Sequence, residues 1–164
     1  MILKAQEHQI VNKNDFKINA KFSLFAKKKD LTKIIKKFDE IKSIDMEIEC
    51  GFEDEIKKGI KFFMYKKNGL NYFVHGKNAD FEYIDFENYN DNFVIYKNKK
   101  ISYQTTINEL KKIFPIAYGN YLYEIKNNKG KGIIVLKFNK DWDDELRIYF
   151  KEGKVYAFGY WYPC

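Results

Sequence analysis

Arginine is almost missing from this 164-residue sequence, although the chain is basic. Arg147 is the only arginine among 30 cationic residues, and the formal net charge is +7. Proteins that read nucleic acids rely on arginine for bidentate and stacking contacts, which lysine does not make. An AT-rich coding sequence also produces chains rich in Lys, Asn and Ile. The charge therefore favours a nucleic-acid partner only weakly, and a lysine-based nucleic-acid-binding module stays as the alternative function.

Cysteine is scarce as well, with Cys50 and Cys164 as the two examples. Small secreted domains that depend on disulfides carry more. A single bridge between these residues and two free thiols both remain open. Cys164 is a poor candidate nucleophile, because the last residue of a chain is not held firmly against a base.

Long apolar runs are absent. The first 15 residues, MILKAQEHQIVNKND, contain no apolar run of signal-peptide length, and no stretch reaches the roughly 18 apolar residues of a membrane span. The sequence predicts a cytoplasmic protein with no membrane segment, acting as a monomer or weak dimer. A signal peptide removed ahead of this sequence is compatible with the same residues.

Catalytic and metal-binding patterns are also missing. The two histidines, His8 and His75, are far apart and have no third ligand at metal spacing. None of the three serines lies in a nucleophile-elbow pattern. The segment KNNKGKGI, residues 126–133, lacks the spacing of a phosphate loop and is typical of a hairpin loop. We therefore predict a protein that is not an enzyme and uses no metal or cofactor.

Aromatic residues, by contrast, are plentiful. They make up 18% of the chain, mostly Phe and Tyr, and the hydrophobic share of 45% indicates a folded protein. Phe and Tyr favour strands. The length fits one domain or two small ones.

Two segments have helical periodicity. In residues 29–39, KDLTKIIKKFD, an apolar stripe follows Asp30 as a possible cap. In residues 105–115, TTINELKKIFP, Thr106 and Glu109 form a capping box, and Pro115 ends the helix. The stripes comprise Leu31, Ile34, Ile35 and Phe38 in the first segment, and Ile107, Leu110 and Phe114 in the second.

Strand-like alternation surrounds both helices. It precedes them in residues 16–25 and in residues 93–103, where Lys97–Lys100 suggest a tight turn. It follows them in residues 44–53, 59–67, 70–76 and 79–86, and then in 120–125, 132–140, 145–153 and 155–161.

The two halves match in order at offsets of 73 to 77 residues. The matched features are Gly59-Ile60 with Gly132-Ile133, Tyr72-Phe73 with Tyr149-Phe150, Gly76-Lys77 with Gly153-Lys154, and Phe81 and Tyr83 with Phe158 and Tyr160. Composition alone produces some matching, but the shared order favours duplication. We predict an α+β fold of two tandem similar units, 1–90 and 91–164, each a helix packed on an antiparallel sheet, joined in one compact body.

Two places carry candidate binding residues. Trp142 is surrounded by Asp141, Asp143, Asp144 and Glu145, which is typical of a polar hairpin turn and also of a surface that docks onto a basic protein. In the last strand, Tyr156, Phe158, Tyr160 and Tyr162 share one face, and Val155, Ala157, Gly159 and Trp161 share the other. Both faces are apolar enough for burial, and an exposed tyrosine face would suit partner recognition. The residues chosen as partner-binding are Trp142, Asp143, Asp144, Tyr160 and Trp161.

The second half resembles small bacterial immunity proteins encoded beside secreted toxins. The resemblance covers residues 93–162 and is carried by FVIYKNKKISYQTTINELKKIFP and LRIYFKEGKVYAFGYWYP. It implies a hairpin, a Thr-capped helix and further strands, in a protein that binds and blocks a cognate toxin. The tandem build is also similar to that of beta-lactamase inhibitor proteins, although this chain lacks paired cysteines within each half. Neither resemblance assigns functional residues.

Overall fold

A large antiparallel sheet joins the two halves of the chain. The computed structural model describes residues 7–46, 51–125 and 131–163, and the side chains of 121–125 and 131 are not described. The strands lie in the order β3-β4-β5-β6-β11-β10-β9, and β2 also pairs with β6. The bounds are β2 Phe25–Lys27, β3 Glu40–Ile44, β4 Phe62–Lys67, β5 Leu70–His75, β6 Asn78–Asp85, β9 Lys131–Lys137, β10 Glu145–Lys151 and β11 Lys154–Trp161.

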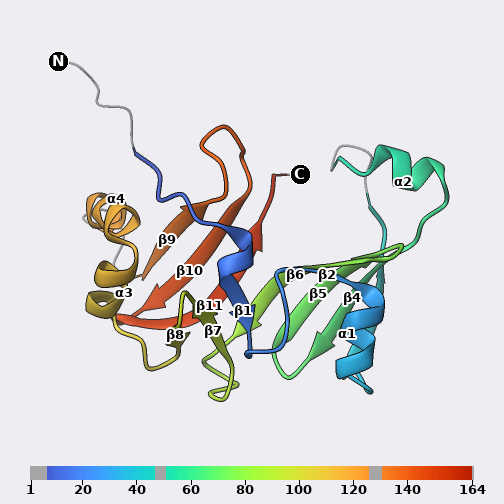
Figure 1. The fold of residues 1–164 in the computed structure, drawn as a ribbon, viewed down its shortest axis with the longest axis horizontal. Coiled ribbons are helices and arrows are strands. Elements are labelled where there is room, and N and C mark those ends of the chain that lie inside the picture. The colour runs from blue at the N-terminus through green and yellow to red at the C-terminus, as the bar shows by residue number, and fades with distance from the viewer. Residues whose placement is uncertain (1–6, 47–50, 126–130, 164) are drawn as a thin grey trace.

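A small sheet and three of the helices pack on one side of the large sheet, which we call its core face. The small sheet has the order β1-β7-β8, with β1 at Phe16–Ile18, β7 at Phe93–Tyr96 and β8 at Lys99–Ser102. Helix α1, Lys28–Ile34, lies at one end of the molecule, and α3, Ile107–Ile113, and α4, Pro115–Ile125, lie at the other (Figure 1). One buried cluster joins Leu31 of α1, Leu110 of α3 and Ile134 of β9. Each half therefore has helix and sheet on a shared core.

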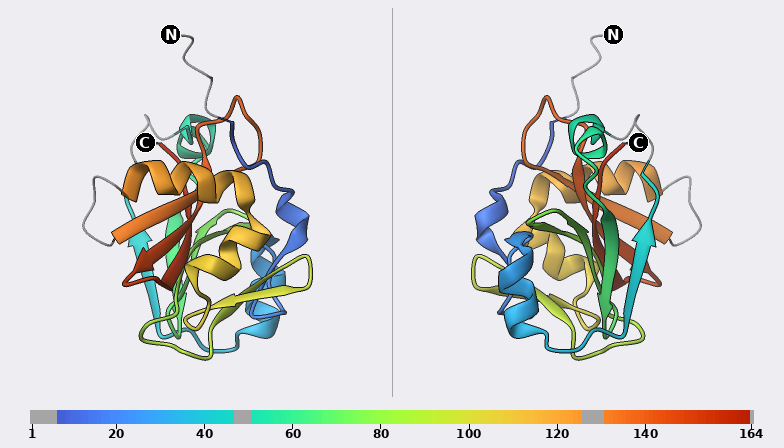
Figure 2. Two further views of the ribbon diagram at one scale, coloured as in Figure 1. Left: turned by 90° about the vertical axis from the view of Figure 1, so that its left-hand side faces the viewer. Right: turned by 90° about the vertical axis from the view of Figure 1, so that its right-hand side faces the viewer.

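The ends of the large sheet differ in how they are covered. The left-hand view of Figure 2 shows α3 and α4 at the β9 end, and the right-hand view shows α1 and β3 at the other. The N-terminal segment extends the β9 edge: Val11 N donates to Lys137 O at 2.8 Å, and Lys137 N donates to Gln9 O at 2.9 Å. Two short helices complete the fold, the 3-10 helix η1 at Lys13–Asp15 and α2 at Glu53–Lys57. No helix in the described ranges is long and apolar enough to cross a membrane.

The α+β class and the antiparallel pairing are confirmed. The hairpin of β7 and β8 turns at Lys97 and Asn98, which both have positive φ. The capping box is present, with Thr106 N donating to Glu109 Oε2 at 2.7 Å. The two-residue turn between β7 and β8 is possible because Asn and similar residues tolerate the left-handed backbone.

Several expected elements are wrong in type or extent. Residues 120–125 are helical, because Pro115 ends α3 and then serves as the first residue of α4, where its fixed φ and missing N–H are tolerated. Residues 44–53 are not one strand, since β3 ends at Ile44 and α2 begins at Glu53. Residues 16–25 hold β1 and only the start of β2. The left-handed Asn19 and Ala20 break the strand between them.

The first helix is shorter than its stripe. Its N-cap is Lys27, so Asp30 lies within the first turn instead of capping it, and the helix ends at Ile34. Ile35 and Phe38 still pack against the core from beyond the helix. Two adjacent β-branched residues, Ile34 and Ile35, lower helix propensity at this point.

One proposed equivalence between the halves is displaced by a residue. Tyr72 belongs to the buried cluster, whereas Tyr149 is half-buried on the opposite face and Phe150 is the clustered residue of that pair. The predicted faces of β11 also shift. A bulge in the pairing of β10 with β11 lets Val155 and Phe158 both reach the core, and Tyr156 contacts Tyr149 instead, with ring centroids 6.0 Å apart.

Two of the expectations concern residues outside the described ranges, and a third concerns the boundary between the two units. Cys50 and Cys164 fall outside the described residues, as do residues 126–130 of the expected hairpin loop. The boundary expected between units, at residues 90 and 91, lies between β6 and β7, and the large sheet crosses it through the β6–β11 pair.

Candidate functional site

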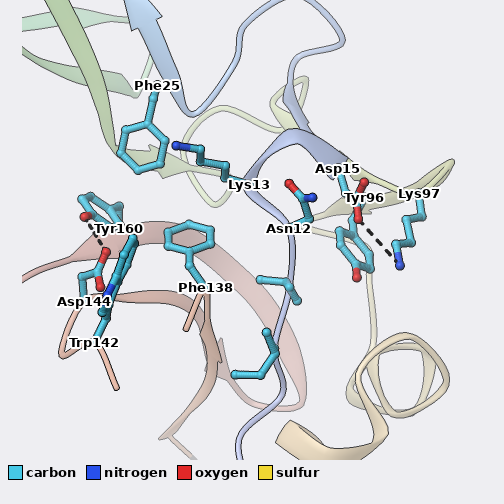
Figure 3. A pocket seen from close by; sticks show the side chains of 12 residues that line it. Asn12, Lys13, Asp15, Phe25, Tyr96, Lys97, Phe138, Trp142, Asp144 and Tyr160 are labelled. Atoms are coloured by element: carbon cyan, nitrogen blue, oxygen red, sulfur yellow. Dashed lines mark hydrogen bonds and ion pairs between the residues drawn. The ribbon is translucent and has the colours of Figure 1, made fainter. Parts of the chain in front are cut away.

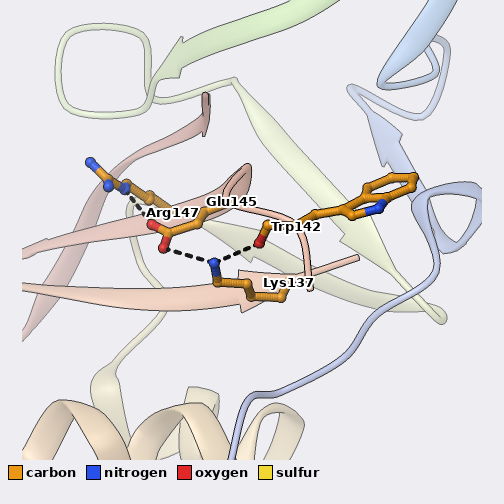
Figure 4. Close-up of polar contacts among 4 residues, drawn as sticks. All are labelled: Lys137, Trp142, Glu145 and Arg147. Atoms are coloured by element: carbon orange, nitrogen blue, oxygen red, sulfur yellow. Dashed lines mark hydrogen bonds and ion pairs between the residues drawn. The ribbon is translucent and has the colours of Figure 1, made fainter. Parts of the chain in front are cut away.

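The turn between β9 and β10 carries Trp142, and a buried lysine holds the backbone of this turn by a hydrogen bond. Lys137, only 9% exposed, donates from Nζ to the backbone carbonyl of Trp142 at 2.9 Å. The same ammonium lies 3.5 Å from Glu145, whose other oxygen accepts from Arg147 Nε at 2.9 Å. Figure 4 shows the indole of Trp142 projecting away from this network. The buried ammonium therefore holds the backbone of the turn that carries the exposed Trp142.

A prediction follows for Lys137. Replacing it with Met keeps most of the apolar stem and removes the ammonium, which leaves the Trp142 carbonyl without that donor. Because Glu145 keeps Arg147 as a partner, we expect the free energy of unfolding to fall by only about 1–2 kcal/mol. Urea unfolding measures this loss. The matched control is Lys140→Met on the same turn, where the side chain is exposed and the change should be within about 0.5 kcal/mol. Equal effects for both variants would contradict the role given to Lys137.

Trp142 stands at a cleft of about 640 Å³ between the N-terminal segment, β2, the β7–β8 turn, the β9–β10 turn and the end of β11. We call it the aromatic cleft. Figure 3 shows Trp142, Asp144 and Tyr160 on one side of it, with Tyr96, Lys97 and Asp15 on the other. Its lining residues are Ile10, Val11, Asn12, Lys13, Asp15, Phe25, Tyr96, Lys97, Phe138, Trp142, Asp144 and Tyr160.

Three rings from three elements form one continuous wall of the aromatic cleft. Phe25 of β2 and Tyr160 of β11 meet perpendicularly with ring centroids 5.3 Å apart. Phe138, just beyond β9, lies 5.9 Å from Phe25 and 6.2 Å from Tyr160. The three rings thus support one another, and the wall keeps its shape without a ligand.

A hydrogen bond fixes the polar end of this wall. Tyr160 donates from its hydroxyl to Asp144 Oδ2 at 2.8 Å. Burial, together with the neighbouring Asp144 carboxylate, raises the pKa of Tyr160 well above its usual value. The phenol therefore stays protonated at physiological pH and remains a donor.

The five residues chosen from the sequence do not form one group. Trp142, Asp144 and Tyr160 meet at the aromatic cleft, and Asp143, in the same turn, is not part of its lining. Trp161 lies one residue beyond Tyr160 and so faces the other side of the sheet, where the Arg147 guanidinium stacks 4.1 Å from its ring. The turn predicted for the acidic segment is confirmed, since it connects β9 to β10.

Sequence reasoning missed Lys13, Phe25 and Phe138. Phe25 comes more than 100 residues before the turn that it faces, and no local pattern marks it. Phe138 follows Lys137 at the end of a strand and carries a weak signal, because an apolar residue there can continue the inward-facing series.

His75 lies away from the aromatic cleft and is held by an acid and three aromatic rings. Its Nε2 lies 2.9 Å from Asp80 Oδ2, and its ring packs against Phe52, Phe62 and Phe73. It ends β5, as the sequence indicated. Within the described ranges, no three acidic, histidine or cysteine side chains gather as metal ligands would.

Comparison with protein-family models, curated protein sequences and solved structures gives no match to this chain.

Proposed function

We propose that this chain is a non-catalytic immunity protein that binds a cognate protein toxin and neutralises it by occlusion. The observation that carries the proposal is Trp142, which is 55% exposed and stands at the mouth of the aromatic cleft, on a turn whose backbone is held by Lys137. Tryptophan and tyrosine dominate the binding energy of protein interfaces, because they give large contact area with few rotatable bonds. Because the backbone of this turn is already held by Lys137, the turn itself has less to lose in conformational entropy on binding.

The charges of the aromatic cleft also favour a protein partner. Two lysines and two aspartates line it, so their formal charges cancel. Lys97 lies 3.6 Å from Asp15. A nucleic acid gains affinity from lysines that are free to replace its counterions, and a cleft without net positive charge offers little of that gain.

The alternative is a nucleic-acid-binding module, and one observation favours it. Four lysines, Lys27, Lys28, Lys29 and Lys77, line a second hollow beside the start of α1. This hollow shares no lining residue with the aromatic cleft. Proteins that bind single strands combine free lysines and stacking rings in one groove. The second hollow has no aromatic residue in its lining, and the two lysines of the aromatic cleft are balanced by two aspartates, so this alternative is the weaker proposal.

The first test of the function is whether a large toxin gene lies directly upstream of this chain's gene, and the protein encoded there then serves as the toxin candidate. We expect co-expression of the chain to restore growth of cells that produce the C-terminal domain of that protein. Replacing Trp142 with Ala should weaken binding of this domain at least tenfold, about 1.4 kcal/mol, as measured by calorimetry.

The matched control is Trp161→Ala, which removes the other tryptophan from the opposite face of the sheet and should leave binding within about twofold, less than 0.5 kcal/mol. Absence of both binding and protection would reject the proposed function. Tight binding of a fluorescein-labelled oligothymidylate, lost at high salt, would instead support the nucleic-acid alternative.

We also propose that the chain consists of two copies of one unit. With an offset of 77 residues, Phe16 corresponds to Phe93 and Phe81 to Phe158. β1 pairs antiparallel with β7, and β6 with β11, so the first and last strands of one half each pair with their counterparts. Phe81 and Phe158 lie in contact, with ring centroids 5.7 Å apart. Such pairing is what a two-fold relation between two copies requires.

A further inference from the structure

The wall of the aromatic cleft is electrostatically suited to a cation. The faces of Phe25, Phe138 and Tyr160 carry the negative part of the ring quadrupole, and the three rings lie within 5.3 to 6.2 Å of one another. An ammonium group within about 6 Å of such a ring is attracted to it.

The chain already places one of its own cations there. The ammonium of Lys13, in η1, lies 5.3 Å from the centroid of the Phe25 ring. Figure 3 shows this side chain extending into the cleft toward Phe25. Lys13 is an exposed residue and makes no ion pair with an acid within the described part of the chain. It can therefore leave the ring at small cost.

A carboxylate that can accept a further hydrogen bond lies at the other end of the wall. Asp144 accepts from Tyr160 through Oδ2, and its second carboxylate oxygen makes no hydrogen bond within the described ranges. The raised pKa of Tyr160 keeps its hydroxyl protonated, so the hydroxyl remains the donor in this bond. Trp142 stands beside it with an exposed ring. Aromatic rings together with one free carboxylate oxygen form a site for an alkylammonium.

We infer that the aromatic cleft receives a lysine side chain of the bound protein, and that Lys13 occupies the Phe25 end of the cleft until that lysine displaces it. The inference deepens the proposed function, on which the identity of the bound protein rests. Charge complementarity decides the occupant, because an apolar anchor would leave the free Asp144 oxygen buried without a partner. Lys13 then acts as an internal competitor that lowers affinity for weak ligands.

The test uses the full chain and two short peptides. Trp161→Phe leaves Trp142 as the only tryptophan and thus as the fluorescent reporter of the cleft. We expect acetyl-Gly-Lys-Gly-amide to bind at least fivefold more tightly than acetyl-Gly-norleucine-Gly-amide, which has the same chain length without the charge. In this background Lys13→Met should improve lysine-peptide affinity at least threefold, since the competing ammonium is gone.

The carboxylate is tested by a matched pair of substitutions. Asp144→Asn keeps an acceptor for Tyr160 and should abolish the preference for lysine over norleucine. Asp143→Asn removes the same charge from the same turn, outside the cleft, and should keep the preference. Equal affinity for the two peptides, or an unchanged or weakened affinity in Lys13→Met, overturns the inference. Circular dichroism and urea midpoints show whether each variant is folded.

The two proposals fail separately. Lysine preference without toxin protection would reject the immunity function and keep the site. Toxin protection without lysine preference would reject the site and keep the function.

Discussion

Replacing Phe158 with alanine is expected to lower the free energy of unfolding by about 3–5 kcal/mol. Phe158 is fully buried in β11, where that strand pairs with β6. Its ring lies 5.8 Å from Phe16 and 5.7 Å from Phe81, so its removal opens a cavity where both sheets meet. Urea unfolding followed by circular dichroism measures the loss, and we expect a single transition because one buried cluster spans both halves.

Trp161→Ala gives the comparison on the same strand. Trp161 is partly exposed, at 37%, and its main contact is the stacked Arg147 guanidinium. Its loss should cost no more than about 1 kcal/mol. A Phe158→Ala variant no less stable than Trp161→Ala would contradict the central position given to Phe158.

The second large effect is expected at Gly69. This residue has φ +74° and follows Asn68 in the two-residue turn between β4 and β5. A Cβ at Gly69 would overlap the Tyr89 ring, with Cε2 2.9 Å away, and would lie 3.1 Å from the Cβ of Asp85. Left-handed backbone costs an alanine about 1 kcal/mol, and forced packing adds about 1–3 kcal/mol. We expect Gly69→Ala to destabilise the chain by about 2–4 kcal/mol in urea unfolding.

Gly153 separates these two contributions. It occupies the same position in the turn between β10 and β11, with φ +75°, and a Cβ there meets nothing within 4 Å. Gly153→Ala should therefore show the backbone cost alone, about 1 kcal/mol. Adding Tyr89→Ala to Gly69→Ala should recover the packing part of the loss. If both substitutions lowered the free energy of unfolding equally, the Tyr89 ring would be moving aside at no measurable cost, which would contradict the packing contribution.

The strands were predictable where turn chemistry marks their ends. β4, β5 and β6 follow from alternation interrupted by Asn68-Gly69 and Gly76-Lys77, and α3 follows from its capping box. Helix α4 was not predictable, because Tyr121, Tyr123 and Ile125 recur at every second position, as they do in a strand. Pro115 favours the first position of a helix, and the helix that begins there continues through residues 120–125 in spite of their strand-like alternation.

The candidate site was predictable only in part. Trp142 and Asp144 are neighbours in one turn, and Tyr160 meets them because Leu146 pairs with Tyr160 across β10 and β11. Phe25 reaches the same place through the pairing of β2 with β6, which no local pattern indicates. Alternation along the last strand already placed Trp161 on the face opposite Tyr160, and in the structure Trp161 stacks on Arg147 away from the cleft.

The strand order has a consequence for any fragment of this protein. The aromatic cleft takes Lys13 and Phe25 from the first half, and Phe138, Trp142 and Tyr160 from the second. Cutting the chain between residues 90 and 91 would leave neither piece with a complete cleft. If each unit once existed alone, it had no such surface. On that condition, the aromatic cleft would be younger than the fold of each unit, because it would have formed only when two units were joined.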